Sequence, residues 1–143
     1  KGGAPVPTPA ARVENMLSMR YIDGGGGPAP RLQDYRPPDP ARLMERVLQG
    51  VTALGRAGVV HTDLSPYNIL VAEGDPWFID LSEAIRVDRT GDSPYTRLTE
   101  AERALRAGLG ALERYFRRFG LEFDPETIAA PLMREWDRFG VMR

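Results

Sequence analysis

The sequence predicts a mainly helical α+β domain in which a small β-hairpin lies beside a loop of polar residues. Apolar residues recur at helical spacing in three segments, and two short apolar runs flank a turn in the middle of the chain. Hydrophobic residues make up 42% of the 143 residues and charged residues 27%, which is typical of a folded domain. This length is enough for one domain with a core and too short for two ordinary ones.

The N-terminal part predicts strand and then loop. The segment VENMLSMRYI (residues 13–22) mixes alternating and continuous apolar character and predicts a strand, with room for the end of another strand before it. The following DGGGGPAP contains four glycines and two prolines, which cannot continue a strand. We therefore expect a flexible loop before the first helix.

The first helix is expected at residues 40–57. Asp39 and Pro40 form an N-cap followed by proline at the first helical position, and Gly58 provides a C-terminal stop. The apolar residues at helical spacing are Leu43, Val47, Val51 and Leu54.

Two more helices are expected in the C-terminal half. Thr99 with Glu102 three residues later has the pattern of a capping box, and the helix that follows ends at Gly120. Asp124 and Pro125 open the last helix. The expected inward-facing residues are Leu105, Leu109, Leu112, Phe116 and Phe119 in one helix, and Ile128, Leu132 and Trp136 in the other.

The middle of the chain predicts a hairpin. Residues 68–72 (NILVA) and 77–79 (WFI) are expected to be short strands around the turn EGDP, and a short apolar step at residues 59–60 precedes them. Residues 86–97 contain a glycine and a proline and predict a loop. The polar stretch HTDLSPY therefore lies between a helix and a hairpin.

The charge and the residue types that the sequence lacks bear on function. The net charge is −1 without a long basic run, which argues against a dominant nucleic-acid surface, although Arg114, Arg117 and Arg118 could form a local patch. No cysteine is available for a disulfide or a thiolate metal site, which fits a reducing compartment, and we expect a cytoplasmic protein. No apolar run approaches the ~18 residues of a membrane span, so no membrane partner is expected.

Three polar residues near the hairpin carry the chemical argument. Asp63 lies in the turn HTDLSPY, where its carboxylate could accept the proton of an incoming hydroxyl as a general base. Asn68 heads the next strand and Asp80 ends the second one, so both can reach the same place. An amide oxygen and a carboxylate, completed by phosphate oxygens and water, form a normal Mg²⁺ site.

Each of these residues alone is more often a turn residue, because Asp and Asn side chains bond nearby backbone amides. For His61, the only histidine, a structural role is favoured, since the chain offers no second histidine for a zinc site and no catalytic triad. Together, however, an HxD, an Asn five residues later and a strand-ending Asp twelve residues further match the catalytic loop of protein kinases.

These motifs resemble those of the RIO family of atypical serine/threonine kinases, and its typical-RIO branch fits best. HTDLSPYNILV with FIDLSEAI is similar to the family's D-L-S-x-x-N catalytic loop and I-D-x-x-x-A/S metal loop. GAPVPTP, LSMRYIDGGGGPAPRLQD and ALERYFRRFGL resemble the segments that enter the central strands, form the hinge and follow the metal loop. The similarity covers residues 3–125 and implies a protein-kinase-like large lobe with a hinge.

The resemblance implies ATP and Mg²⁺ as cofactors and assigns the chemical roles. Asp63 would be the catalytic proton acceptor, and Asn68 and Asp80 would hold Mg²⁺ and the nucleotide phosphates. Asp80 would also act as a phosphate acceptor that forms an acyl-phosphate. Ser65 would make a local hydrogen bond.

Nucleotide contacts are implied at the hinge. Met19 would lie at the back of the adenine pocket, while the backbone groups of Arg20 and Ile22 would meet adenine. On the same resemblance, residues 1–27 would be the end of the small lobe and the hinge, and residues 28–143 the large lobe.

The sequence also departs from a complete kinase. The glycines at residues 24–27 are not a phosphate-binding loop, because no G-K-[ST] follows them, and Lys1 is the only lysine. We therefore expect the phosphate-covering loop and the lysine–glutamate pair upstream in a longer protein, and little turnover by this chain alone. The family's histidine-proline pair is not matched in VDRTGDSPY, so the handling of a protein substrate stays open.

Two alternatives remain. A small-molecule phosphotransferase of the aminoglycoside or choline kinase type shares H-x-D-L-x-x-x-N and a later I-D, but Ser65 and IDLSEA favour the RIO family. A non-catalytic kinase-like scaffold would keep the acids without turnover. Association with the ribosome or its precursors would follow from family resemblance only.

Overall fold

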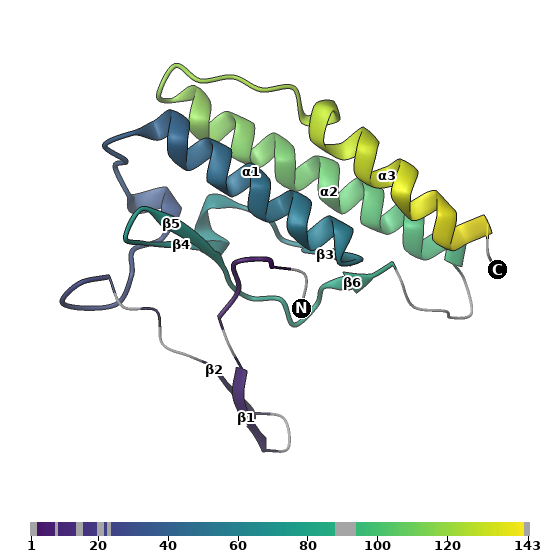
Figure 1. Cartoon of the computed structure of the whole chain (residues 1–143), viewed down its shortest axis with the longest axis horizontal. Helices are drawn as coiled ribbons and strands as arrows, with labels where there is room; N and C mark the ends of the chain where they lie inside the picture. Colours follow the sequence, from purple (N-terminus) through teal and green to yellow (C-terminus); the bar gives the residue numbers. More distant parts are fainter. Residues whose placement is uncertain are drawn as a thin grey trace.

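The computed structural model describes residues 3–7, 9–13, 16–19, 22, 24–87 and 94–141. Within these ranges, three long helices pack together and three antiparallel strand pairs lie below them, which confirms the predicted mainly helical α+β class (Figure 1). The elements are β1 (Pro9–Val13), β2 (Met16–Met19), the 3₁₀ turn η1 (Leu32–Asp34), α1 (Pro40–Arg56), β3 (Val59–Val60), the 3₁₀ turn η2 (Pro66–Asn68), β4 (Ile69–Ala72), β5 (Asp75–Phe78), β6 (Ile85–Arg86), α2 (Pro94–Arg117) and α3 (Pro125–Val141). No helix in the described ranges is long and apolar enough to cross a membrane.

Helix α1 forms as predicted. The Asp39 carboxylate caps it by accepting a hydrogen bond from the backbone N–H of Arg42 at 3.1 Å, and Pro40 occupies the first position. The four apolar residues predicted to face inward are all buried. They join a core to which α2, α3 and the hairpin contribute Ile69, Phe78, Leu105, Leu109, Leu112, Phe116, Leu132 and Trp136.

Helix α2 begins at Pro94, so the capping box predicted at Thr99 is wrong. The hydroxyl of Thr99 lies inside the helix and donates to the carbonyl of Tyr95 at 2.9 Å. A proline suits the first position of a helix because it has no N–H to leave unpaired. The C-terminal end agrees with the prediction, since Gly120 adopts a φ of 74° just after the last helical turn.

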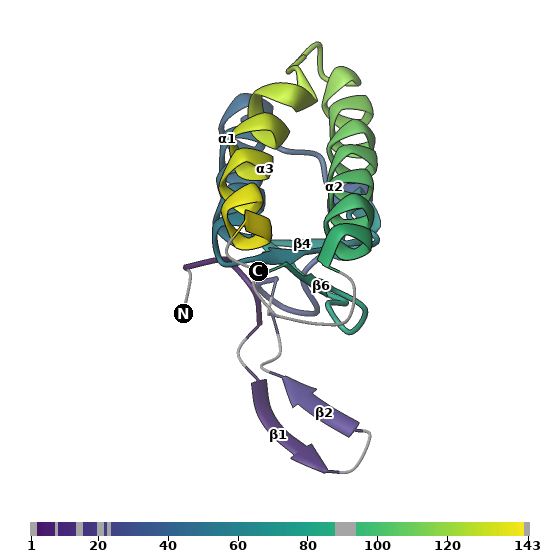
Figure 2. The same ribbon diagram turned by 90° about the vertical axis from the view of Figure 1, so that its right-hand side faces the viewer.

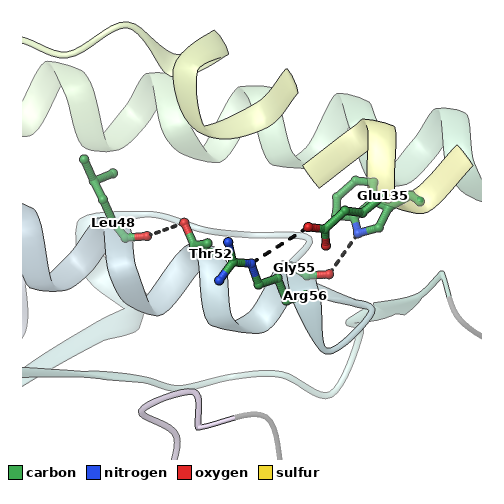
Figure 3. Close-up of polar contacts among 6 residues, drawn as sticks. Leu48, Thr52, Gly55, Arg56 and Glu135 are labelled. Atoms are coloured by element: carbon green, nitrogen blue, oxygen red, sulfur yellow. Dashed lines mark hydrogen bonds and ion pairs between the residues drawn. The ribbon is translucent and has the colours of Figure 1, made fainter. Parts of the chain in front are cut away.

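Helix α3 packs against both α1 and α2. Its N-terminus is capped by the Asp124 carboxylate, which accepts a hydrogen bond from Glu126 N–H at 3.0 Å. The indole N–H of Trp136, 1% exposed, donates to the carbonyl of Gly55 at 2.9 Å. Figure 3 shows this end of α1 facing α3, where Arg56 and Glu135 form an ion pair at 3.9 Å.

Strands β4 and β5 form the predicted hairpin, but its turn is shorter than EGDP. Only Glu73 and Gly74, with φ values of 54° and 78°, form the turn, while Asp75 and Pro76 lie in β5. Proline is tolerated because the register pairs Pro76 with Val71 without needing its N–H. The arginine Arg46 of α1 forms an ion pair with Asp75 and ties the hairpin to the helix.

Both edges of this hairpin are covered by segments that precede it in the chain. Val71 N–H donates to the carbonyl of Pro30 at 2.9 Å on one edge, and Phe78 N–H donates to the carbonyl of Pro5 at 2.8 Å on the other. The hairpin is thereby integrated into the lobe and offers no open edge at these positions.

The remaining strands differ from the prediction in extent. Val13 belongs to β1 and pairs with Met16 of β2, so the segment at residues 13–22 contributes to two strands. The β1–β2 hairpin projects away from the helices in both views (Figures 1 and 2). Ile85 and Arg86 form β6 on β3, so Arg86 is not in a loop as predicted, because a two-residue strand depends on a distant partner.

Candidate active site

Residues 61–68 connect β3 to β4 and rest on helix α2. The buried side chain of Leu64 lies against Gly108, where an added Cβ would come within 2.5 Å of the Cβ of Leu64. Only glycine therefore permits this close approach. The turn that carries Asp63 is therefore packed closely against helix α2.

Asp63 and Asn68 lie side by side in the structure. The side-chain amide nitrogen of Asn68 donates to the backbone carbonyl of Asp63 at 2.9 Å and to its Oδ2 at 3.1 Å. Because both bonds use Nδ2, Oδ1 of Asn68 has no hydrogen-bond donor among the described residues and can face a cation. Ser65 accepts a hydrogen bond from Tyr67 N–H at 3.3 Å and so caps η2, which is the local role that the family resemblance implied.

The backbone brings Asp80 next to Asn68. Ile79 N–H donates to the carbonyl of Asn68 at 3.0 Å, and Asp80 follows directly with its carboxylate exposed. Asp80 has a φ of 62°, in the left-handed region that non-glycine residues rarely adopt. Strained backbone of this kind clusters at functional sites and persists only where the surroundings hold it. The hydroxyl of Ser82 donates to Oδ1 of Asp80 at 3.4 Å.

His61 links the two acid-bearing loops. Its side chain is 4% exposed, its Nδ1 accepts the backbone N–H of Asp63 at 3.0 Å, and its Nε2 lies 2.7 Å from the carbonyl of Ile79. Since Nδ1 accepts a hydrogen bond, the neutral ring carries its proton on Nε2 and donates it to Ile79. The structural role that the sequence favoured for His61 therefore consists of two hydrogen bonds, one to each loop.

The oxygen ligands at the site suit Mg²⁺. No group of three or more His, Cys, Asp or Glu side chains that could hold a metal ion is present in the described part of the chain. Asn68 and Asp80 offer hard oxygen ligands, and Mg²⁺ in proteins usually takes one or two carboxylates and completes its octahedron with water and phosphate. This donor set fits a nucleotide-bound Mg²⁺ better than a metal held by protein alone.

The structure describes only part of the segment that was predicted to contact the nucleotide. The carbonyl of Ile22, a residue 8% exposed, accepts Ala29 N–H at 3.1 Å, which closes the glycine loop. Met19 is the last residue of β2, and Arg20 falls outside the described residues. Adenine contacts by Met19, Arg20 and Ile22 therefore stay predictions.

The fold and the site together define the large lobe of a kinase-like fold. A family model described as the RIO domain matches residues 1–128, so the chain belongs to the RIO domain family. The expected family membership is confirmed.

Named relatives agree with this assignment. The chain is 32% identical over 128 residues to the RIO-type serine/threonine-protein kinase Rio1 of Haloferax volcanii. The aligned region covers 90% of this chain and 41% of that protein. It is 31% identical over 124 residues to the Rio1 of Thermoplasma acidophilum, with coverages of 87% and 60%. The chain thus spans about half the length of these relatives.

A solved structure shows the same fold. The chain superimposes with a TM-score of 0.70 on the Rio2 kinase of Chaetomium thermophilum, solved as an ADP/Mg²⁺-phosphoaspartate complex. The two sequences are 23% identical, and the match covers 92% of this chain and 39% of that one.

Proposed function

We propose that the protein containing this chain is an ATP- and Mg²⁺-dependent phosphoryl transferase, a RIO-type serine/threonine kinase or ATPase. The observation that carries the proposal is the hydrogen-bonded pair of Asp63 and Asn68 with Asp80 next to it on the backbone. The Rio1 relatives are named as serine/threonine-protein kinases, and the Rio2 structure contains ADP and Mg²⁺, which supports the same chemistry here.

Each side chain has a role in this proposal. Asn68 Nδ2 orients the Asp63 carboxylate, which accepts the proton of the attacking hydroxyl. Asn68 Oδ1 and the Asp80 carboxylate would hold Mg²⁺, which would supply positive charge beside the phosphates of ATP. Phosphoryl transfer depends mainly on such positioning and charge stabilisation.

Asp80 has a second role in an ATPase cycle. One of its carboxylate oxygens attacks the γ-phosphorus of ATP, the bond from that phosphorus to the bridging oxygen breaks, and ADP leaves. Water then hydrolyses the acyl-phosphate to phosphate and the free carboxylate. The phosphoaspartate of the Rio2 complex supports this step.

The proposal includes a division of the chain. Residues 1–27 belong to the end of the small lobe and the hinge, with Met19, Arg20 and Ile22 at the adenine, and residues 28–143 form the large lobe. On sequence and family resemblance, the proposal extends to a cytoplasmic location and to association with ribosome precursors.

The test uses the full-length gene product. We expect Mg²⁺-dependent ATP turnover and autophosphorylation, with losses of about 10²-fold or more in Asp63→Ala and Asp80→Ala. Asp137→Ala, which removes an exposed carboxylate of α3, is the control and should turn over ATP like the wild type. Hydroxylamine should release phosphate from wild-type protein that has been phosphorylated with γ-labelled ATP, because hydroxylamine cleaves acyl-phosphates.

Three results would argue for another function. A wild type that binds ATP without turnover supports the non-catalytic scaffold. Turnover stimulated by kanamycin or choline and not by protein supports a small-molecule phosphotransferase. Intact turnover in both Asp63→Ala and Asp80→Ala removes the proposed site.

A further inference from the structure

The loop that carries Asp80 accepts a hydrogen bond from Thr62, a residue that lies outside the loop and has no role in the sequence motif. We propose that Thr62 is a positioning residue that keeps this loop in its metal-binding conformation. The inference rests on the proposed function, because it concerns how Asp80 is presented to Mg²⁺.

Two neighbouring residues hold the loop on either side of Asp80. The Thr62 hydroxyl donates to the carbonyl of Glu83 at 3.2 Å, and His61 donates to the carbonyl of Ile79 at 2.7 Å. The bond to Ile79 therefore lies one residue before Asp80, and the bond to Glu83 lies three residues after it. Because His61 and Thr62 directly precede Asp63, the position of one acid is tied to that of the other.

The loop is anchored at its ends by the bond of Ile79 N–H to Asn68 and by the pairing of β6 with β3, but the bonds within it are local. Ser82 and Glu83 are exposed, Leu81 and Ala84 are half-buried, and the backbone bond from Ala84 N–H to the carbonyl of Leu81, 3.1 Å long, closes only a local turn. No glycine occurs between Asp80 and Ala84 to relieve the φ of 62° at Asp80. Such a conformation persists only when neighbouring groups fix it, and the Thr62 bond is one of them.

The Thr62 bond differs from the hydroxyl bonds of Thr52, Thr99 and Thr127. The hydroxyls of Thr52, Thr99 and Thr127 bond carbonyls three or four residues away in their own helices or caps. The Thr62 bond joins residues 21 positions apart and connects two separate loops. A bond of this kind is expected to constrain tertiary geometry, whereas a local one is not.

The experiment compares Thr62→Val, which removes the donor and keeps the shape, with Thr62→Ser, which keeps the hydroxyl, in the full-length protein. We expect Thr62→Val to raise the Mg²⁺ concentration for half-maximal ATP turnover by about 3- to 10-fold, the equivalent of one hydrogen bond. Hydrogen exchange at the Ala84 amide should accelerate by a similar factor. Thr62→Ser should show the wild-type Mg²⁺ dependence and the wild-type exchange rate at Ala84.

Thr52→Val provides a matched control, since it loses a hydroxyl bond within α1, to the carbonyl of Leu48 (Figure 3). It should leave the Mg²⁺ dependence and Ala84 exchange unchanged. The proposal is overturned if Thr62→Val behaves like the wild type, or if Thr62→Ser shows the same change in Mg²⁺ dependence and Ala84 exchange as Thr62→Val. If the wild type shows no Mg²⁺-dependent turnover, the proposed function fails separately, and Ala84 exchange alone decides whether Thr62 holds the loop.

Discussion

The side-chain amide of Asn68 donates to both the backbone carbonyl and the carboxylate of Asp63, at 2.9 and 3.1 Å. One residue therefore fixes the orientation of the proposed base and, through its remaining Oδ1, faces the proposed metal. Loss of this single side chain should disturb both functions at once.

We expect Asn68→Ala to lower both the turnover number and the apparent affinity for Mg²⁺. The variant removes the proposed metal ligand and two hydrogen bonds worth about 0.5–1.5 kcal/mol each. A titration of ATP turnover against Mg²⁺ measures both effects. Gln49→Ala removes an exposed amide of α1 and should change neither value, and an Asn68→Ala variant with normal Mg²⁺ dependence would contradict the metal-ligand role.

Replacement of His61 should loosen the contact between the two loops. His61→Leu leaves Asp63 N–H and the Ile79 carbonyl without partners, at a cost of about 1–3 kcal/mol for each group that stays buried. Thermal unfolding measures the loss, and His61→Gln should lose less because its amide can both donate and accept. The ¹⁵N resonances of the His61 ring can be assigned because they disappear in His61→Gln. They should be those of a ring with its proton on Nε2, and a proton on Nδ1 would contradict the two hydrogen bonds.

Gly108→Ala should destabilise the protein and disturb the turn of Asp63. The new methyl group would lie 2.5 Å from Leu64 Cβ, and overpacking of this kind typically costs about 1–3 kcal/mol. Gly110→Ala is the matched control, because its Cβ would meet only the end of Arg114 at 3.5 Å. An alanine there should raise the free energy of unfolding by up to about 1 kcal/mol, through its better helix propensity. Equal effects of the two variants in denaturant unfolding would argue against the close contact.

Tyr115 should make the stability fall at high pH. Burial raises the pKa of its phenol above the usual 10.0, against a smaller opposite effect of Arg118. The raised pKa means that the stabilisation is fully present below pH 10 and is lost as the pH rises through the folded-state pKa. The free energy of unfolding should therefore decrease above pH 10, by up to about 1.4 kcal/mol per pH unit.

The matching variant is Tyr115→Phe. It should flatten this decrease and lose the hydrogen bond from the phenol to the carbonyl of Tyr35, 3.1 Å long, which is worth about 0.5–1.5 kcal/mol at neutral pH. Tyr95→Phe, at a side chain 80% exposed, should change neither property. An unchanged alkaline slope in Tyr115→Phe would show that another group causes it.

The sequence predicted those features that depend on neighbours in the chain. The cap at Asp39 and the buried positions of α1 follow from local pattern, and so does the hairpin that brings Asn68 and Asp80 together. The match of Asp63, Asn68 and Asp80 to the kinase catalytic loop also followed from their spacing, whereas the hydrogen bonds between Asp63 and Asn68 are known only from the structure. These predictions required no knowledge of distant contacts.

Features that depend on distant partners could not be predicted. The start of α2 was misplaced because Thr99 and Glu102 match a capping box equally well inside a helix, where the hydroxyl bonds the preceding turn. The two-residue strand β6 exists only because β3 pairs with it. Thr62 has no motif of its own, since its role depends on a carbonyl 21 residues away.

The hydrogen bond from Phe78 N–H to the carbonyl of Pro5 has a mechanical consequence. Phe78 lies two residues before Asp80, and its ring fits over Gly50, where a Cβ would lie 2.4 Å from the ring and 3.1 Å from Pro5. Residues 3–7 lead directly toward the β1–β2 hairpin that projects from the helices (Figure 2). The segment that precedes this hairpin is therefore bonded to the strand residue two positions before Asp80, the proposed metal-binding aspartate, and so connects the N-terminal part of the chain to the proposed site.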